Sequence, residues 1–152
     1  MILTNNDVLE EVIHEIMDDM FFLFPELDEE GLPMQYKELN PPYLDAGIHF
    51  NTEDLLRIRI DYGLLTEMAS NFTGLPPESI EQEHLESTAA ETANIIGGNF
   101  LVKIDPEQNY KLSIPELLEA NQALAVADRP WQLSFISENG GLLCWPEPLK
   151  KS

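Results

Sequence analysis

The first part of the chain alternates between helical and irregular patterning. Over residues 7–22, apolar side chains recur with the spacing of one helical face, and acidic side chains occupy the opposite face. This pattern predicts an amphipathic helix that ends before Pro25, because a helix usually stops ahead of a proline. Residues 25–42 are rich in Pro, Asp and Glu and predict a loop. The loop is long enough to leave room for a short strand at 34–39.

Two strand-like runs follow, at residues 43–50 and 55–60, and the polar link 51–54 predicts a hairpin turn between them. The second run alternates strictly, so that Arg57 and Arg59 share one face and aliphatic side chains share the other. We interpret the two arginines as partners of neighbouring carboxylates on a solvated sheet face. Binding of an acidic partner is the alternative.

Two further helices are predicted, over residues 63–72 and 78–104, since each carries helical periodicity bounded by Gly or Pro. The longer one contains Gly97 and Gly98. A glycine inside a helix costs about 1 kcal/mol relative to alanine. We therefore expect a packing or functional reason for this pair.

The C-terminal third predicts more sheet. Residues 110–114 have strand character, 116–126 are ambiguous, and a hairpin is predicted from 131–137 and 141–145 around an Asn-Gly turn. The prolines that follow predict a tail outside the sheet, 148–152, because proline lacks the N–H that a ladder needs.

The order of these elements predicts an α+β fold, with helices packed on a mostly antiparallel sheet, in a single domain over residues 1–147. The chain length of 152 residues suits one domain with a real core.

Charge and composition narrow the possible functions. The chain has 28 acidic residues against 8 basic ones and a net charge of −20, so neither a nucleic acid nor an anionic membrane is an expected partner. The single cysteine, Cys144, allows no disulfide within the chain and is interpreted as a small core residue. The three histidines lack metal-binding spacing, so no metal site is expected. With no signal peptide or membrane span visible in the sequence, we expect a soluble cytoplasmic protein.

The long helix carries two stripes on a helical wheel. One is apolar and is assigned to the core; it consists of Leu85, Ala89, Thr92, Ile96 and Phe100. The second stripe is polar, with small residues around a carboxylate and a carboxamide one turn apart; it consists of Ser87, Glu91, Asn94 and Gly98. A smooth polar face of this kind is suited to docking a partner and presenting two side chains to it. A plain solvated face is the alternative.

These residues resemble the signature of the CheC/CheX family, phosphatases that act on phosphorylated CheY-like response regulators. The family pattern is Asp or Ser, then Glu, then Asn, then a distant Pro, and here it is met by Ser87, Glu91, Asn94 and Pro115. Gly-Asn after the asparagine and Leu-Ser-Ile-Pro at 112–115 also match. The gap between Asn94 and Pro115 is slightly short. Members with two sites carry a second Glu and Asn on the first helix, which this chain lacks, so the resemblance is to single-site, CheX-like members.

The resemblance implies a CheC-like fold and a set of roles. Asn94 would orient the attacking water, and Glu91 would pair with the active-site lysine of a phosphorylated CheY-like receiver domain. The Mg²⁺ would be bound by the receiver, and no cofactor of the chain's own is implied. The docking surface would be bordered by Ser87, Gly98, Asn99 and Pro115.

Two other functions stay open at this point. The same fold could serve as a receiver-binding module without turnover, or the chain could be an acidic dimer of the secretion-chaperone type. A homodimer is also possible in the first two cases, through exposed strand edges. The charge is awkward for a receiver partner, whose phosphorylation pocket is itself acidic: residues 1–31 alone hold ten Asp and Glu and no Lys or Arg. Docking would then rely on short-range packing and the Glu91–lysine pair.

Overall fold

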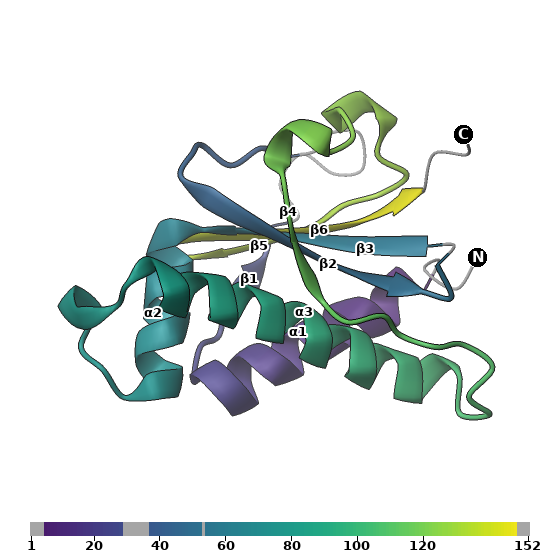
Figure 1. Cartoon of the computed structure of the whole chain (residues 1–152), viewed down its shortest axis with the longest axis horizontal. Coiled ribbons are helices and arrows are strands. Elements are labelled where there is room, and N and C mark those ends of the chain that lie inside the picture. Colours follow the sequence, from purple (N-terminus) through teal and green to yellow (C-terminus); the bar gives the residue numbers. More distant parts are fainter. Residues whose placement is uncertain (1–4, 29–36, 53, 149–152) are drawn as a thin grey trace.

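The structure is a computed structural model that describes residues 5–28, 37–52 and 54–148. Within these residues, three α-helices lie on one face of a six-stranded sheet (Figure 1). The strand order is β1-β5-β6-β3-β2-β4, and every neighbouring pair is antiparallel. The predicted α+β class is therefore confirmed.

All three predicted helices are present. They are α1 (Asn6–Phe21), α2 (Tyr62–Thr73) and α3 (Gln82–Ile104). The third begins four residues later than predicted because Pro77–Ser79 forms a separate 3₁₀ turn, η2, ahead of it. Glu81 and His84 then cap α3 reciprocally, since each side chain bonds the backbone N–H of the other residue. No helix in the described residues is long and apolar enough to cross a membrane.

The strands are β1 (Glu26–Leu27), β2 (Tyr43–Phe50), β3 (Asp54–Asp61), β4 (Glu116–Leu118), β5 (Leu133–Ser137) and β6 (Gly140–Pro148). Both predicted hairpins form, β2 with β3 and β5 with β6. Between β4 and β5 the chain makes two 3₁₀ turns, η3 (Ala120–Gln122) and η4 (Val126–Asp128).

Two strand predictions are wrong. Residues 110–114 form no strand, and only Leu112 makes an isolated bridge, to Phe50. The prolines at the C-terminus do not end the sheet, because β6 continues to Pro148, opposite Asp54. Pairing with β5 stops at Cys144, so the last residues of β6 have one neighbour only. A residue without an N–H can then face the unpaired side at no cost. The possible strand at 34–39 falls largely outside the described residues.

The core lies between the helices and the sheet. The apolar stripe predicted for α3 is confirmed, since all five of its side chains are buried. Gly97 packs against β2: a Cβ added to Gly97 would lie only 3.1 Å from Cγ2 of Ile48. This close approach supplies the packing reason expected for one of the two glycines.

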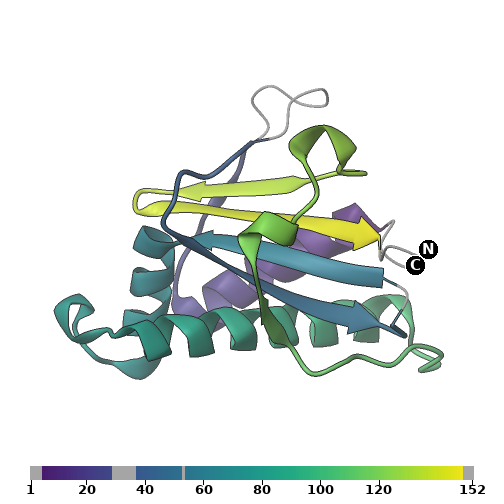
Figure 2. The ribbon, with the colours of Figure 1, turned by 45° about the horizontal axis from the view of Figure 1, so that its top comes forward.

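The opposite face of the sheet was predicted to be solvated, but its two arginines are buried. Arg57 and Arg59 are only 1% and 3% exposed. The segment that carries η3 and η4 runs over this side of the sheet (Figure 2). The predicted pairing with carboxylates is confirmed, since both arginines donate hydrogen bonds to Asp45. The alternation could not reveal that the segment carrying η3 and η4, called the covering segment below, lies over this face.

One residue adopts a conformation that does not suit it. Phe22 follows α1 in the left-handed region, with φ of 55° and ψ of 38°, and the residue is 69% exposed. Glycine is the usual residue at this position, because a Cβ is unfavourable there. We expect Phe22→Gly to raise the free energy of unfolding by about 0.5–1 kcal/mol, as measured by urea denaturation. Phe24 is an exposed neighbour without positive φ, so Phe24→Gly should lower the free energy of unfolding. If Phe24→Gly were the more stable of the two variants, the strain assigned to Phe22 would be contradicted.

Candidate functional site

The polar stripe of α3 points away from the core, as the helical wheel predicts. Ser87 and Glu91 are exposed, and Asn94 and Gly98 are half-buried. Within the described residues, the side chains of Glu91 and Asn94 make neither a hydrogen bond nor an ion pair. The spacing of three residues places the carboxylate and the carboxamide on adjacent turns of one helix face. Both groups therefore remain available to another molecule.

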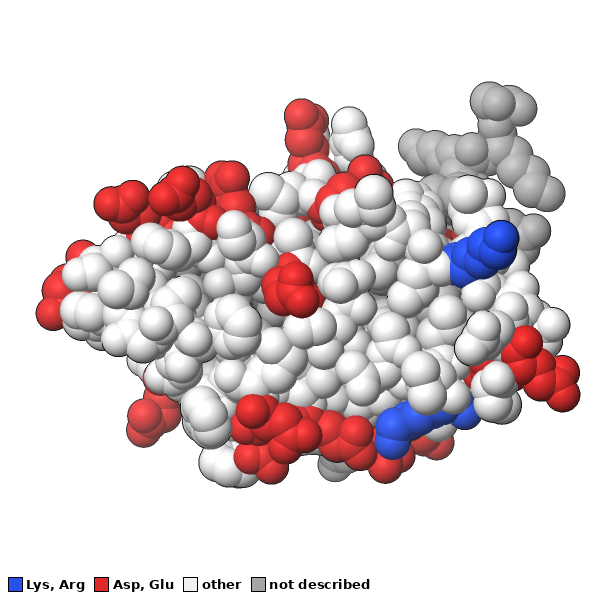
Figure 3. Space-filling view, turned by 60° about the horizontal axis from the view of Figure 1, so that its bottom comes forward, with Lys and Arg blue, Asp and Glu red and all other residues white. Residues whose placement is uncertain are grey.

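The surface around this pair carries little charge. Along α3, the residues from 92 to 102 include no Asp, Glu, Lys or Arg. The space-filling view of this side shows a broad uncharged area, with an isolated acidic group inside it and further acidic groups toward its margins (Figure 3). On this face the acidic groups thus lie mostly at the margins of the uncharged area, which leaves an uncharged surface for short-range packing.

A hollow lies at each end of the stripe. Glu91 and Ser87 border a mainly apolar cavity of about 300 Å³, formed where the ends of α1 and α2 meet α3, with Met20 and Phe72 among its lining residues. Gly98 borders a second cavity of about 430 Å³ at the C-terminal end of α3. The stripe is therefore a ridge between two depressions, a shape that can enter a concave site on a partner.

Gly98 differs from its neighbour in the sequence. A Cβ added to Gly98 would meet nothing within 4 Å, whereas one added to Gly97 would press on Ile48. The fold therefore gives a reason for Gly97 and none for Gly98. An open backbone position beside Asn94 and Glu91 fits the close approach of a partner.

We expect Gly98→Ala to raise the free energy of unfolding by up to about 1 kcal/mol, because alanine favours the helix and meets no obstacle. Gly98→Leu should also fold but should weaken receiver binding, since the larger side chain stands on the docking ridge. Urea denaturation and titration with a receiver measure the two effects. Gly97→Ala is the matched control, and an equal gain in stability there would contradict the assignment.

The remaining predicted site residues occupy two places. Pro115 is half-buried and directly precedes β4, which contacts α3. Asn99 is exposed on α3, but it lies one residue beyond the stripe and its Nδ2 donates a hydrogen bond to the carbonyl oxygen of Ile95, at 2.9 Å. The structure thus brings Ser87, Glu91 and Gly98 together with Asn94 on one ridge and leaves Asn99 at its side.

Other chemistries find little support in the described part of the chain. No group of three or more His, Cys, Asp and Glu side chains there is arranged to hold a metal ion. Cys144 is completely buried, and burial raises the pKa of its thiol well above the ordinary range, so it is a core residue and not a nucleophile. On α1, Glu11 and Glu15 both lie near Lys103, with Nζ–Oε1 distances of 3.5 and 3.4 Å. These acidic side chains are engaged with α3.

Sequence reasoning missed the residues that shape the cavity beside Glu91. Met20 at the end of α1 and Phe72 at the end of α2 line it from segments far apart in the chain. No local pattern could indicate this, because the cavity exists only once the three helices have packed.

Comparison with known proteins identifies the family. Residues 51–135, more than half of the chain, match the family described as chemotaxis phosphatase CheX. No curated protein matches the chain. Among solved structures, CheX from Vibrio vulnificus has a TM-score of 0.70 at 13% identity, covering 97% of this chain and 99% of that one.

Two further structures show how widely the fold is used. The CheX–CheY–BeF₃–Mg²⁺ complex from Borrelia burgdorferi matches with a TM-score of 0.64 at 14% identity, over 96% of this chain and 97% of that one. The middle domain of FliM from Vibrio alginolyticus matches with a TM-score of 0.59 at 12% identity, over 94% and 90%. At such identities these likenesses show the fold alone. The family assignment comes from the match over residues 51–135. The chain belongs to the CheX family of chemotaxis phosphatases.

Proposed function

We propose that this protein hydrolyses the aspartyl phosphate of a CheY-like receiver domain, using Asn94 to orient the attacking water and Glu91 to pair with the receiver's active-site lysine. The observation that supports this most directly is the position of Glu91, which is exposed, and Asn94, which is half-buried, one turn apart on α3, with neither side chain bonded to any described residue. Membership of a phosphatase family agrees with it. The Borrelia complex holds a CheX with a CheY that carries BeF₃ and Mg²⁺, which agrees with a receiver as the partner.

The chemistry needs positioning more than a strong base. In the proposed reaction, water attacks phosphorus in line, the bond from phosphorus to the aspartyl oxygen breaks, and inorganic phosphate and the free carboxylate are released. The Asn94 carboxamide can accept a hydrogen bond from the water through its oxygen and donate one through its nitrogen. Because the amide does not titrate, it can hold the line of attack over a wide pH range. The water's proton is lost to phosphate or solvent.

Charge compensation in this scheme comes from the partner. Mg²⁺ bound by the receiver supplies the electrostatic stabilisation of the transferring phosphoryl group, and this chain contributes no metal ligand. Glu91 contributes orientation: a carboxylate paired with the receiver's lysine fixes the register in which Asn94 enters the pocket. Ser87, Gly98, Asn99 and Pro115 would border the contact.

Phosphate release tests the proposal. A purified CheY-like receiver is charged with acetyl phosphate in the presence of Mg²⁺, and the release of inorganic phosphate is followed with and without this protein. Acceleration that scales with the protein concentration is the expected result. If the receiver treated with BeF₃ binds but phosphate release is unchanged, the protein is a receiver-binding module without turnover. If neither occurs, the receiver is not its partner.

Glu91→Gln should weaken binding to the phosphorylated receiver by about 10- to 100-fold, because one charge-assisted hydrogen bond contributes about 1.5–3 kcal/mol. Titration of the BeF₃-treated receiver measures the effect. Glu83→Gln, which removes an exposed carboxylate two turns earlier on α3, is the matched control and should bind as the unmodified protein does. A loss of equal size in both variants would show that general charge, and not the position of Glu91, determines binding.

A further inference from the structure

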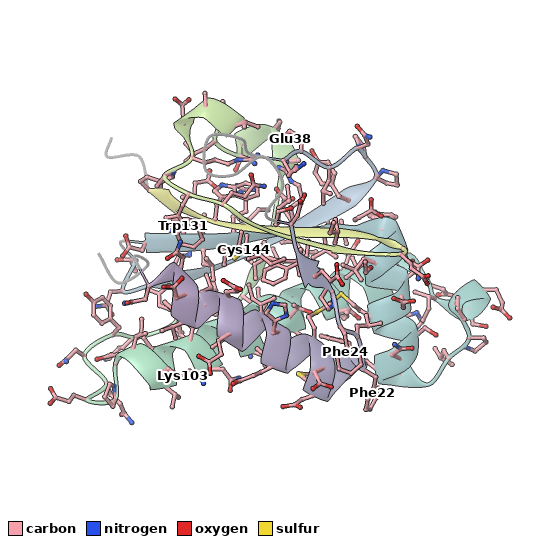
Figure 4. All side chains as sticks on the ribbon, turned by 180° about the vertical axis from the view of Figure 1, so that it is seen from behind. Phe22, Phe24, Glu38, Lys103, Trp131 and Cys144 are labelled. Carbon is pink, nitrogen blue, oxygen red and sulfur yellow. The ribbon has the colours of Figure 1, made fainter. Side chains whose placement is uncertain are left out.

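A second surface, with no residue from α3, carries large exposed apolar side chains. Phe22 is 69% exposed, Phe24 77% and Ile136 48%; we call these three residues the aromatic patch. Phe22 and Phe24 follow the C-terminal end of α1, where Figure 4 labels them together on the side of the molecule on which α1 lies in front. Ile136 lies on β5, opposite Glu26 of β1 in the strand register. None of the three borders the cavity next to Glu91.

Nothing in the fold explains why a phenylalanine occupies position 22. The N–H of Leu23 bonds to the carbonyl oxygen of Met17, at 2.9 Å, and that of Phe22 to the carbonyl oxygen of Asp18, at 3.1 Å, so the chain ends α1 in the form that usually places glycine at Phe22. A phenylalanine here has an unfavourable backbone conformation and an exposed ring at the same time. Strain of this kind, held at an exposed aromatic residue, points to use by a partner.

Two grooves flank Phe24. One, of about 530 Å³, is lined by the aromatic patch together with the carboxylates of Glu26, Glu67 and Glu138. The other, of about 540 Å³, lies on the α1 side of Phe24 and is lined by Glu15, Asp18 and again Glu26. No Lys or Arg among the described residues lines either groove.

The carboxylates around the patch are largely unengaged. Glu26, Glu138 and Asp18 form no ion pair with any described residue. Glu15 forms an ion pair with Lys103, whose Nζ lies 3.4 Å from Oε1, and Glu67 accepts a hydrogen bond from Asn139. An apolar centre bordered by carboxylates, three of them without an ion pair to any described residue, complements a segment that has apolar side chains with lysine or arginine beside them.

We propose that the aromatic patch docks a cationic, amphipathic segment of another protein, at a surface separate from the phosphatase ridge. Apolar side chains of that segment cover Phe22 and Phe24, and its basic side chains reach the carboxylates that line the two grooves. A second copy of this chain is a poor occupant, because it would bring identical carboxylates together on a molecule of net charge −20. Nucleic acid and anionic lipid are repelled for the same reason.

The test uses synthetic peptides and the whole protein. The probe is an amphipathic peptide of Lys and Leu; a scrambled peptide of the same composition and a version with Glu in place of Lys serve as controls. NMR titration should shift the amide signals of residues 22–27 and 136–138, and the affinity should fall as salt is added. The scrambled and acidic peptides should bind more weakly or not at all.

Variants locate the contact. The double variant Phe22→Asn, Phe24→Ser should lower the affinity for the Lys–Leu peptide at least about tenfold, since exposed aromatic anchors contribute most to such contacts. Ile114→Ser, at an apolar residue that is 87% exposed near the opposite sheet edge, is the matched control and should bind normally. Glu26→Gln with Glu138→Gln should reduce both the affinity and its salt dependence, whereas Glu107→Gln, in the loop after α3, should change neither.

Several results would overturn the proposal. Equal binding of the scrambled peptide, shifts confined to other surfaces, or equal losses in the control variants would show that only the overall charge attracts the peptide. A concentration-dependent dimer in sedimentation that disappears in the Phe22→Asn, Phe24→Ser variant would assign the patch to a second copy of the chain. Phosphate release from the receiver should be unchanged in that variant, so this proposal and the proposed function can fail separately.

Discussion

We expect the Asn94→Ala variant to release phosphate from the phosphorylated receiver at least about a hundredfold more slowly than the unmodified protein, which corresponds to about 2.7 kcal/mol of transition-state stabilisation. Alanine cannot hold the attacking water in line, and positioning is the main contribution available in phosphoryl transfer. Asn94 makes no side-chain hydrogen bond within the described residues and is only half-buried. Its removal therefore costs the fold little, and the effect on the rate can be assigned to the reaction.

Binding and turnover separate the roles on the ridge. Asn94→Ala should keep its affinity for the BeF₃-treated receiver within about threefold, because Glu91 and the docking surface are intact. Asn99→Ala is the matched control: its amide bonds to the backbone of its own helix, so phosphate release at saturating receiver should not change. Equal rates for Asn94→Ala and the unmodified protein would exclude Asn94 from catalysis, even if the protein proved to be a phosphatase.

The ridge could be predicted from the sequence because it depends on one element alone. Residues 87, 91, 94 and 98 share a face of any α-helix, whatever packs on the other side. The assignment of the five-residue apolar stripe on α3 to the core needed only the contrast between apolar and polar positions. All five of its side chains are buried. Motif and periodicity therefore agreed before any tertiary contact was known.

Features that depend on contacts between distant segments could not be predicted. Strict alternation in β3 placed Arg57 and Arg59 on one face, but it could not say that the segment after β4 covers that face. That segment contains only short 3₁₀ turns, which leave no periodic signal. β1 is two residues long, too short for any alternation to be read. The cavity beside Glu91 and the aromatic patch likewise arise only when α1, α2 and the sheet have assembled.

The buried charges beneath that covering segment form one network centred on Asp45. Arg57 donates a hydrogen bond to Oδ2 of Asp45 at 2.6 Å, and Arg59 donates to Oδ1 and Oδ2 at 2.7 and 2.8 Å. Arg57 also contacts Glu147. Burial alone would lower the pKa of Arg59, but the hydrogen bonds and charge of Asp45 outweigh it, and the pKa is raised. Asp45 is therefore the carboxylate that keeps both arginines paired.

Two aromatic rings and a third arginine extend this network. The guanidinium of Arg59 lies 4.2 Å from the ring centre of Tyr43, and that of Arg129 lies 3.8 Å from the ring centre of Trp145. Burial lowers the pKa of Arg129, although Glu38, 2.8 Å away, acts against this. Glu38, which precedes β2, thus links Arg129 of the covering segment to Arg59 on the sheet face, since it also lies 3.4 Å from Arg59.

Asp45→Asn should lower the free energy of unfolding by about 3–5 kcal/mol, because it leaves two buried arginines without their shared carboxylate. Urea denaturation measures the loss. Lys103→Gln, which breaks exposed ion pairs with Glu11 and Glu15, is the control and should leave the urea midpoint almost unchanged.

The decisive comparison is a double variant. Arg57→Met alone leaves Glu147 without its arginine, whereas Asp45 keeps Arg59. Asp45→Asn alone leaves Arg57 with Glu147 and Arg59 with the half-exposed Glu38, so each single change unbalances the buried charges. Together the two changes remove one charge of each sign, and the combined loss should be smaller than the sum of the single losses. Strict additivity would mean that Asp45 and Arg57 contribute independently. The network would then be a set of separate contacts.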